Sequence, residues 1–103
     1  MPRRGEVWMV DLGYQGKMRP ALVLTDPPTS AERNLYTIVS RTASARGSQW
    51  ELSINKRFFT KAGVFDLQQI LSIDFRYFKN RLGELTTAEM QTVDEYLKRR
   101  LQL

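Results

Sequence analysis

Residues 35–40 read Leu-Tyr-Thr-Ile-Val-Ser, a run of β-branched and aromatic residues that favours extended backbone. The stretch before it, Ala-Leu-Val-Leu-Thr at residues 21–25, is short and nearly continuously apolar, as expected of a central strand. Residues 6–12 alternate, so that their apolar side chains fall on one face. These side chains are Trp8, Val10 and Leu12. The three segments predict three strands.

Further strands are predicted towards the C-terminus. Residues 50–54 (Trp-Glu-Leu-Ser-Ile) alternate into a fourth strand. Residues 63–67 and 69–73 are expected to form two more short strands, or one strand with a bend. The stretch between residues 41 and 48 has no apolar period and is predicted to be a loop.

Towards the C-terminus the spacing of the apolar residues changes from the strand period to the helix period. Thr86 and Glu89 have the spacing of a capping box, in which each side chain bonds the backbone N–H of the other residue. The apolar residues that follow repeat at helical spacing and predict one buried stripe, made of Met90, Val93, Leu97 and Leu101. A C-terminal helix is therefore expected.

Five or six strands and one helix in 103 residues predict a single domain over residues 1–103. Its class is mainly β (α+β), a compact antiparallel barrel or sandwich with a C-terminal α-helix. No apolar run reaches the ~20 residues of a membrane span, and the first residues lack the apolar region of a signal peptide. The sequence thus predicts a soluble, cytoplasmic protein without a membrane partner.

The positive charge is concentrated in the middle of the chain. The net charge is +5, and the segment from residue 14 to residue 61 holds eight Lys or Arg and three Asp or Glu. This excess suggests a polyanionic partner, most simply nucleic acid, although a solvated basic surface would look the same. The chain contains no cysteine and no histidine, which excludes disulfides, thiolate chemistry and a histidine acid or base.

The remaining residue types favour a site that acts by position and electrostatics. The aspartates at positions 11, 26, 66 and 74 are spread singly, so their spacing does not support a Mg²⁺ site. RNA carries its own nucleophile, the 2′-hydroxyl beside each phosphate. A guanidinium aimed at the phosphoryl oxygens would stabilise the charge of the transition state without a metal or other cofactor.

Several segments, taken in order, resemble the MazF/PemK toxins of type II toxin–antitoxin modules. These segments are residues 4–12, 18–24 with its Arg-Pro pair, 37–44, 63–74, 81–85 and the C-terminal helix. The resemblance spans nearly the whole chain. It implies a small SH3-like antiparallel β-barrel that forms a homodimer and cleaves single-stranded RNA without metal. The implied products are a 2′,3′-cyclic phosphate and a 5′-hydroxyl, and the implied partner is an antitoxin with an acidic, partly disordered tail.

The resemblance also indicates which residues form the site. Arg19 matches the family's catalytic arginine, which holds the scissile phosphate, and Thr42 matches the catalytic threonine. Gln69 matches a polar position of the groove, where it would contact a base edge or the RNA backbone. Further RNA-binding candidates are Lys17, Arg41 and Arg46 for phosphates, Ser44 as a hydroxyl, and Tyr14 for base stacking.

The chain departs from the family pattern in its loop from Gly13 to Met18, which is shorter than in many members, at Arg41, which stands where proline is common, and at two further positions. Gln68 stands where some members have an acidic residue, and Leu71 stands where many have an arginine. An alternative function is therefore a non-catalytic module on the same barrel, which would bind RNA or poison gyrase. RNA cleavage in EDTA separates the two functions.

Overall fold

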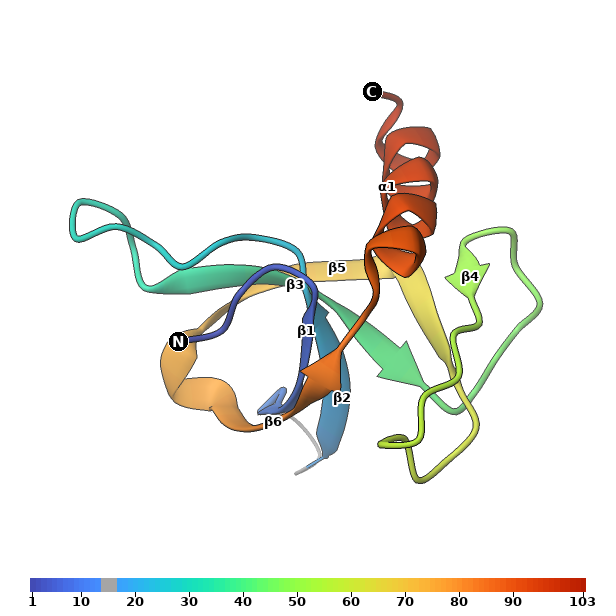
Figure 1. The fold of residues 1–103 in the computed structure, drawn as a ribbon, viewed down its shortest axis with the longest axis horizontal. Helices are drawn as coiled ribbons and strands as arrows, with labels where there is room; N and C mark the ends of the chain where they lie inside the picture. The colour runs from blue at the N-terminus through green and yellow to red at the C-terminus, as the bar shows by residue number, and fades with distance from the viewer. Residues whose placement is uncertain (14–16) are drawn as a thin grey trace.

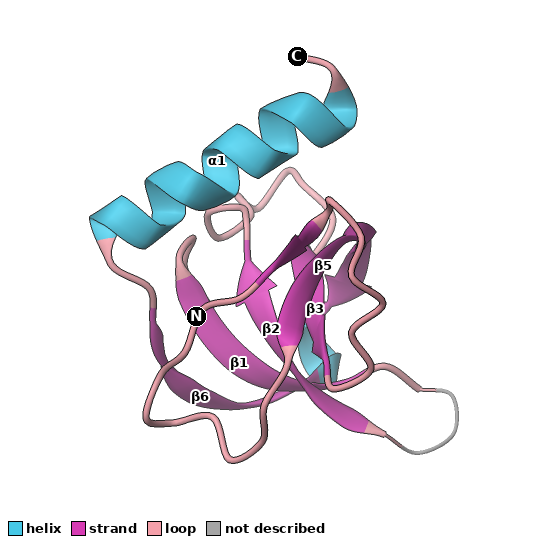
Figure 2. Cartoon of the chain, turned by 90° about the vertical axis from the view of Figure 1, so that its right-hand side faces the viewer, coloured by secondary structure: helices cyan, strands magenta, loops and turns pink. Residues whose placement is uncertain are grey.

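The computed structural model describes residues 1–13 and 17–103, and this part of the chain forms one antiparallel sheet with a C-terminal helix. The six strands follow the order β4-β5-β3-β2-β1-β6 across the sheet. The elements are β1 (Glu6–Asp11), β2 (Met18–Val23), β3 (Leu35–Thr42), β4 (Glu51–Leu52), β5 (Val64–Asp74), the 3-10 turn η1 (Phe75–Tyr77), β6 (Phe78–Glu84) and α1 (Thr87–Leu101). The sheet curls strongly, and α1 lies across one end of it (Figures 1 and 2). The expected mainly β fold with a C-terminal helix is confirmed.

Strand β5 is one long bent strand, which settles the choice left open by its sequence. It pairs with β3 at Val39 and Ile70, and again at Arg41 and Phe65. Between these two pairs β3 advances by two positions while β5 advances by five. Strand β5 therefore forms a bulge between the two paired regions. The bulge matters because it turns side chains of residues 66–69 away from their regular alternation.

Two strand predictions need correction. The fourth strand is only Glu51–Leu52. Just before it, the backbone N–H of Trp50 donates to the Ser48 hydroxyl, which forms a turn. Strand β6 was not predicted from its sequence, because Phe78–Glu84 carries charged and polar residues at most positions. It is held by pairing with β1, whose backbone forms the ladder hydrogen bonds of β6. The side chains of β6 give no sequence signal of this pairing.

The core has two apolar clusters, on the two faces of the sheet. One lies under α1 and contains Val7, Leu22, Val39, Phe65, Leu67 and Val93 among its buried residues. The other contains Val10, Val23, Tyr36, Ile38 and Phe78. Trp8 and Leu12 pack with Val10 against the second cluster, so the predicted face of β1 is confirmed.

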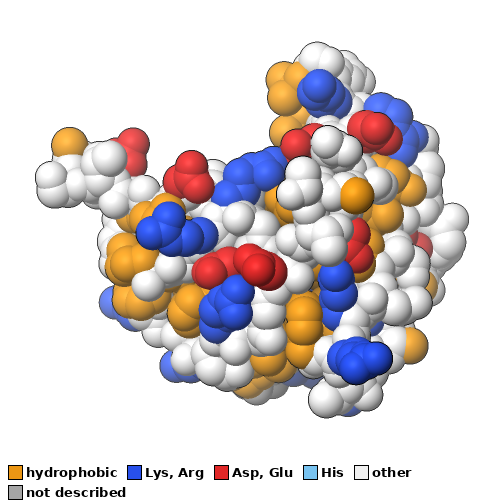
Figure 3. Space-filling view, viewed as in Figure 1, with side chains coloured by type: hydrophobic (Ala, Val, Ile, Leu, Met, Phe, Trp, Pro, Cys, Tyr) orange, Lys and Arg blue, Asp and Glu red, His pale blue; other side chains and the backbone are white. Residues whose placement is uncertain are grey.

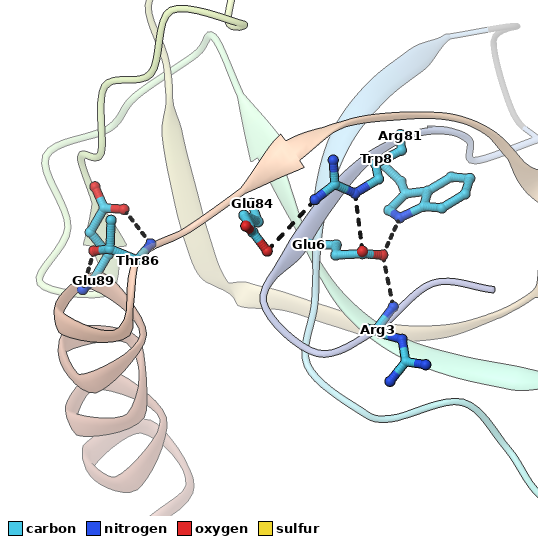
Figure 4. Close-up of polar contacts among 7 residues, drawn as sticks. All are labelled: Arg3, Glu6, Trp8, Arg81, Glu84, Thr86 and Glu89. Atoms are coloured by element: carbon cyan, nitrogen blue, oxygen red, sulfur yellow. Dashed lines mark hydrogen bonds and ion pairs between the residues drawn. The ribbon is translucent and has the colours of Figure 1, made fainter.

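The helix prediction is correct, but the predicted buried stripe ends before Leu101. The Thr86–Glu89 capping box is present, as Figure 4 shows, and Val93 is buried. Met90 and Leu97 pack against the first cluster, but Leu101 is 53% exposed. Its turn extends beyond the sheet, where nothing covers it (Figure 1). No helix in the described residues is both long and apolar enough to cross a bilayer.

Candidate functional site

A cavity of about 480 Å³ lies where β2, β3 and β5 meet. Its polar lining consists of Arg19, Ser40, Thr42, Ser44, Arg46, Asp66 and Gln69. A second cavity of about 500 Å³ shares Arg19, Thr42 and Ser44 with the first. Apart from Thr60, the remaining lining of the second cavity is cationic or apolar, including Lys17, Arg41, Lys61, Phe58 and Phe59. Arg19 and Thr42 thus stand at the junction of two hollows.

The strands bring Arg19 and Thr42 together. Ala21 pairs with Ser40 in the β2–β3 ladder, and this is the last paired position towards the cavity. Arg19 and Thr42 each lie two residues beyond it, so they lie on the same face as that pair. The pairing stops there, and the two side chains line the opening between the strands.

Arg19 is half-buried, and within residues 1–13 and 17–103 it forms no ion pair. Thr42 is 7% exposed, and its hydroxyl oxygen accepts a hydrogen bond of 3.1 Å from the backbone N–H of Ser44. Because that bond uses the oxygen as acceptor, the hydroxyl proton remains available for a ligand. The pair therefore offers a positive charge and a hydrogen-bond donor to an anionic group.

A hydrogen-bonded chain forms the floor of the first cavity. Buried Ser40 donates to Gln69 Oε1 at 2.8 Å, and Gln69 Nε2 donates to Asp66 Oδ2 at 3.4 Å. The other carboxylate oxygen of Asp66 accepts from the backbone N–H of Gln68 at 3.0 Å. Asp66 is only 9% exposed. These bonds fix the positions of the polar groups at the bottom of the cavity.

Arg41 occupies a different environment from the exposed one expected of a phosphate-binding cation. It is 6% exposed, its guanidinium carbon lies 3.8 Å from the centre of the Phe59 ring, and Nη1 donates to the carbonyl of Lys61 at 2.9 Å. Burial lowers the pKa of this guanidinium, since the charged form loses water. Arg41 therefore lies behind the surface of the second cavity.

The structure brings most of the predicted residues to one place. Arg19, Thr42, Ser44, Arg46 and Gln69 line the first cavity, while Lys17 and Arg41 line the second. Tyr14 lies outside the described residues.

Sequence reasoning missed Ser40 and Asp66 as members of the site. The sequence signal for Asp66 is a carboxylate between the apolar residues Phe65 and Leu67, in a segment that otherwise reads as a buried strand. Leu71, one of the departures from the family pattern, also lines the first cavity.

Charge is mixed on the face of the molecule that Figure 3 shows. In Figure 3, basic and acidic side chains lie next to one another on the face shown. Across the described part of the chain, no three carboxylates gather as ligands for a metal ion. Two cations that line the first cavity, Arg19 and Arg46, have no ion pair in the described residues, whereas Arg81 pairs with Glu6.

The family of this chain follows from a comparison of its sequence with models of known families. Residues 3–101 match the model of the PemK-like, MazF-like toxin of type II toxin–antitoxin system. The chain belongs to this toxin family. The match covers every segment that carried the resemblance, from the first strand to the end of the helix.

Solved structures with the same fold include other MazF proteins. An endoribonuclease in complex with its cognate antitoxin, from Mycobacterial species, has 23% identity and a TM-score of 0.82, and the match covers 100% of this chain and 97% of that one. MazF from Deinococcus radiodurans has 22% identity and a TM-score of 0.80, with 99% and 97% covered. MazF in a MazE–MazF structure from the same organism has 22% identity and a TM-score of 0.77, with 97% and 94% covered. The MazF-like fold is thus shared over the whole domain.

Proposed function

We propose that this member of the MazF/PemK family is a metal-independent, sequence-selective endoribonuclease toxin that cleaves single-stranded RNA. The observation that carries the proposal is the position of Arg19 and Thr42, side by side in the lining of both cavities and with the Arg19 charge unpaired in the described residues. An unpaired, half-buried guanidinium beside a free hydroxyl proton suits a phosphate group.

The reaction begins with the 2′-hydroxyl of the RNA. As the bond between the 2′-oxygen and phosphorus forms and the bond between phosphorus and the 5′-oxygen breaks, negative charge builds up on the phosphoryl oxygens. Arg19 stabilises this charge and passes a proton to the leaving 5′-oxygen. Thr42 hydrogen-bonds the phosphate and orients the 2′-hydroxyl, whose proton passes to solvent water as the 2′-oxygen attacks. Arg19 regains from solvent the proton that it gives to the leaving oxygen. The products are a 2′,3′-cyclic phosphate and a 5′-hydroxyl.

The other cavity residues bind the RNA on either side of the scissile phosphate. Lys17 and Arg46 contact phosphates, and Ser44 and Gln69 contact the sugar or base edges. Arg41, being buried, adds its charge to the local potential. Tyr14 is retained as the residue on which a base stacks.

The same proposal includes two protein partners. We expect the toxin to form a homodimer and to be held inactive by a cognate antitoxin with an acidic, partly disordered tail. Its net charge of +5 favours such a tail, since acidic residues would compete with RNA phosphates for the same cations. RNA and antitoxin would meet it in the cytoplasm.

Cleavage of a long single-stranded RNA in EDTA tests the proposal. Wild type should release fragments with 5′-hydroxyl ends, while Arg19→Ala and Thr42→Ala should each slow cleavage by roughly 10²–10³-fold, as expected when one preorganised donor is lost. Arg33→Ala, at an exposed arginine that lines neither cavity, is the matched control and should cut at the wild-type rate.

Two results would count against the proposal. Intact RNA would exclude the nuclease, and retention of gyrase by the same preparation would then support the non-catalytic alternative. Equal cleavage by Arg19→Ala and wild type would show that the assigned residues are wrong. A deoxyribose oligomer should remain uncut, since it lacks the attacking hydroxyl.

A further inference from the structure

The hydrogen-bonded chain on the floor of the first cavity has a fixed direction. Gln69 turns its oxygen towards the hydroxyl of Ser40, at 2.8 Å, and its nitrogen towards the carboxylate of Asp66, at 3.4 Å. All three residues line the cavity that contains Arg19 and Thr42. The floor of the cavity therefore holds an amide whose two ends are each bound to a different partner.

The bulge of β5 makes this arrangement possible. Asp66 and Gln69 are three residues apart, so in a regular strand their side chains would point to opposite faces. The register of β5 shifts between Phe65 and Ile70, and both side chains reach the same cavity. The backbone N–H of Gln68 donates to Asp66 Oδ1 at 3.0 Å, which holds the carboxylate in place within the bulge.

Only one of the two partners determines which way the amide faces. A hydroxyl can donate or accept, so Ser40 would bond either end of the amide. A carboxylate has acceptors only, and it would repel the amide oxygen. Asp66 is 9% exposed, so water can do little to weaken that repulsion. Asp66 therefore keeps the amide nitrogen on its own side.

The Gln69 amide nitrogen has two N–H groups and its oxygen has two lone pairs, and one of each is used in the bonds to Asp66 and Ser40. One N–H and one oxygen lone pair therefore remain free for a ligand. Adenine and cytosine present an amino group next to a ring nitrogen that accepts. Uracil and guanine present the reverse, a carbonyl oxygen next to a ring N–H. Uracil carries a second carbonyl on the far side of its ring N–H, so a fixed amide distinguishes the two patterns in a base whose position is held by stacking and backbone contacts. An amide that can turn over does not distinguish them.

We propose that Asp66 is a specificity-determining residue, which locks the Gln69 amide so that the cavity accepts adenine or cytosine and rejects uracil or guanine. The carboxylate adds to this preference, since it accepts from an amino group and repels a carbonyl oxygen. This inference rests on the proposed RNA cleavage. It names the class of base bound beside the scissile phosphate.

The substitution Asp66→Asn tests whether the carboxylate fixes the orientation of the Gln69 amide, because it changes the shape of the side chain very little. The asparagine keeps an oxygen for the Gln68 N–H and presents an NH₂ to Gln69, which would then turn its oxygen towards position 66. Wild type should cut a random-sequence RNA pool with adenine or cytosine enriched at one position near the cut. At that position Asp66→Asn should shift the preference towards uracil and guanine by on the order of tenfold, the discrimination given by one good base contact.

Two further variants serve as controls. Ser40→Ala removes the partner that can bond either end, so the amide orientation and the preference for adenine or cytosine should persist. Gln69→Met, at an exposed position, removes the reader itself and should abolish the preference without reversing it. Because Gln69 is exposed, this variant keeps the test informative even if Asp66→Asn does not fold. In the wild-type cleavage data, the relative enrichment of adenine and cytosine at that position shows which of the two accepted bases is preferred.

Binding of uncleavable RNA separates this inference from the proposed function. Four 2′-O-methyl heptanucleotides, each built from one base, are titrated against wild type and Asp66→Asn. Tighter binding of the adenine and cytosine strands by wild type, lost in the variant, supports the lock even if no RNA is cut. An unchanged preference in Asp66→Asn overturns the lock while leaving cleavage intact. An equal loss of turnover on all sequences would make Asp66 a proton acceptor, and would also overturn it.

Discussion

The guanidinium of Arg41 lies over the ring of Phe59, with its central carbon 3.8 Å from the ring centre, and Arg41 is only 6% exposed. Its Nη1 donates to the Lys61 carbonyl, and its Nε has no partner in the described structure. The charge is therefore held by a ring and one carbonyl, without a carboxylate. Such a buried charge keeps much of its desolvation cost.

This environment predicts that the charge of Arg41 contributes little to stability. Arg41→Met retains a long apolar stem and removes the desolvation cost, so its free energy of unfolding should stay within about 1 kcal/mol of wild type. Arg41→Ala leaves a cavity beside Phe59 and should lower that free energy by about 2–3 kcal/mol. Urea unfolding of the three proteins measures both differences. Equal losses in the two variants would mean that the charge itself is required.

Gly63 should be essential for the backbone position of Thr42. A Cβ at Gly63 would lie 2.7 Å from the Thr42 carbonyl oxygen, and backbone cannot rotate aside as a side chain does. Gly63→Ala should therefore displace Thr42, lower the free energy of unfolding by about 1–3 kcal/mol, and reduce RNA cleavage per folded molecule.

Gly83→Ala is the matched comparison, because its Cβ would meet the Phe58 ring at 2.4 Å. A ring can move, and Phe58 has no proposed role in the reaction. This variant should lose stability but retain cleavage per folded molecule. If both glycine variants cut equally well, the position of Thr42 would not depend on Gly63. Thermal unfolding and initial cleavage rates, measured on the same samples, supply the comparison.

The RNA affinity should depend on salt through the cavity cations. Arg46 lines the first cavity. Its backbone N–H donates to Glu51, and its guanidinium forms no ion pair in the described chain. Arg46→Gln should weaken RNA binding and reduce the slope of log K against log salt by about 0.7, the value for one phosphate contact on a single strand. Titration of uncleavable RNA at several salt concentrations measures the slope. Equal slopes for Arg46→Gln and wild type would exclude a contact between Arg46 and an RNA phosphate.

Glu6 should make the fold sensitive to acid. Burial alone would raise the pKa of its carboxyl, but hydrogen bonds from Trp8, the Arg3 backbone and Arg81, together with the Arg81 charge, outweigh it and lower the pKa below 4.5 (Figure 4). A lowered pKa in the folded state stabilises the protein above the unfolded pKa, and this stability is lost as the pH falls through the folded pKa.

Glu6→Gln should therefore be less stable than wild type at neutral pH, and should lose less stability on acidification. Unfolding free energies from urea titrations between neutral pH and a pH well below 4.5 provide the test. The β1–β6 pairing depends on this cluster, so the neutral-pH loss should be accompanied by faster amide exchange in β6. Equal losses on acidification in the two proteins would contradict the assignment.

Much of the fold was predictable because its signals are local. The alternation of residues 6–12 and the β-branched run at 35–40 produced strands where expected, and the Thr86–Glu89 capping box marks the start of α1. The polar strand β6 was missed, since its stability comes from pairing with β1. The apolar spacing predicts a buried Leu101, which is in fact exposed. Periodicity cannot show that the last turn of a helix extends beyond the sheet on which the helix packs.

The sequence by itself determined the helix and the strands apart from β6 and the short extent of β4, because alternation, capping and apolar spacing act between near neighbours in the chain. It also limited the chemistry, since a chain without histidine or cysteine must rely on its cations, carboxylates, hydroxyls and amides. Only the tertiary structure decided that Asp66 meets Gln69 and that Arg41 is buried. Those outcomes depend on a bulge in β5 and on where strand pairing ends, which are set by contacts between residues far apart in the chain.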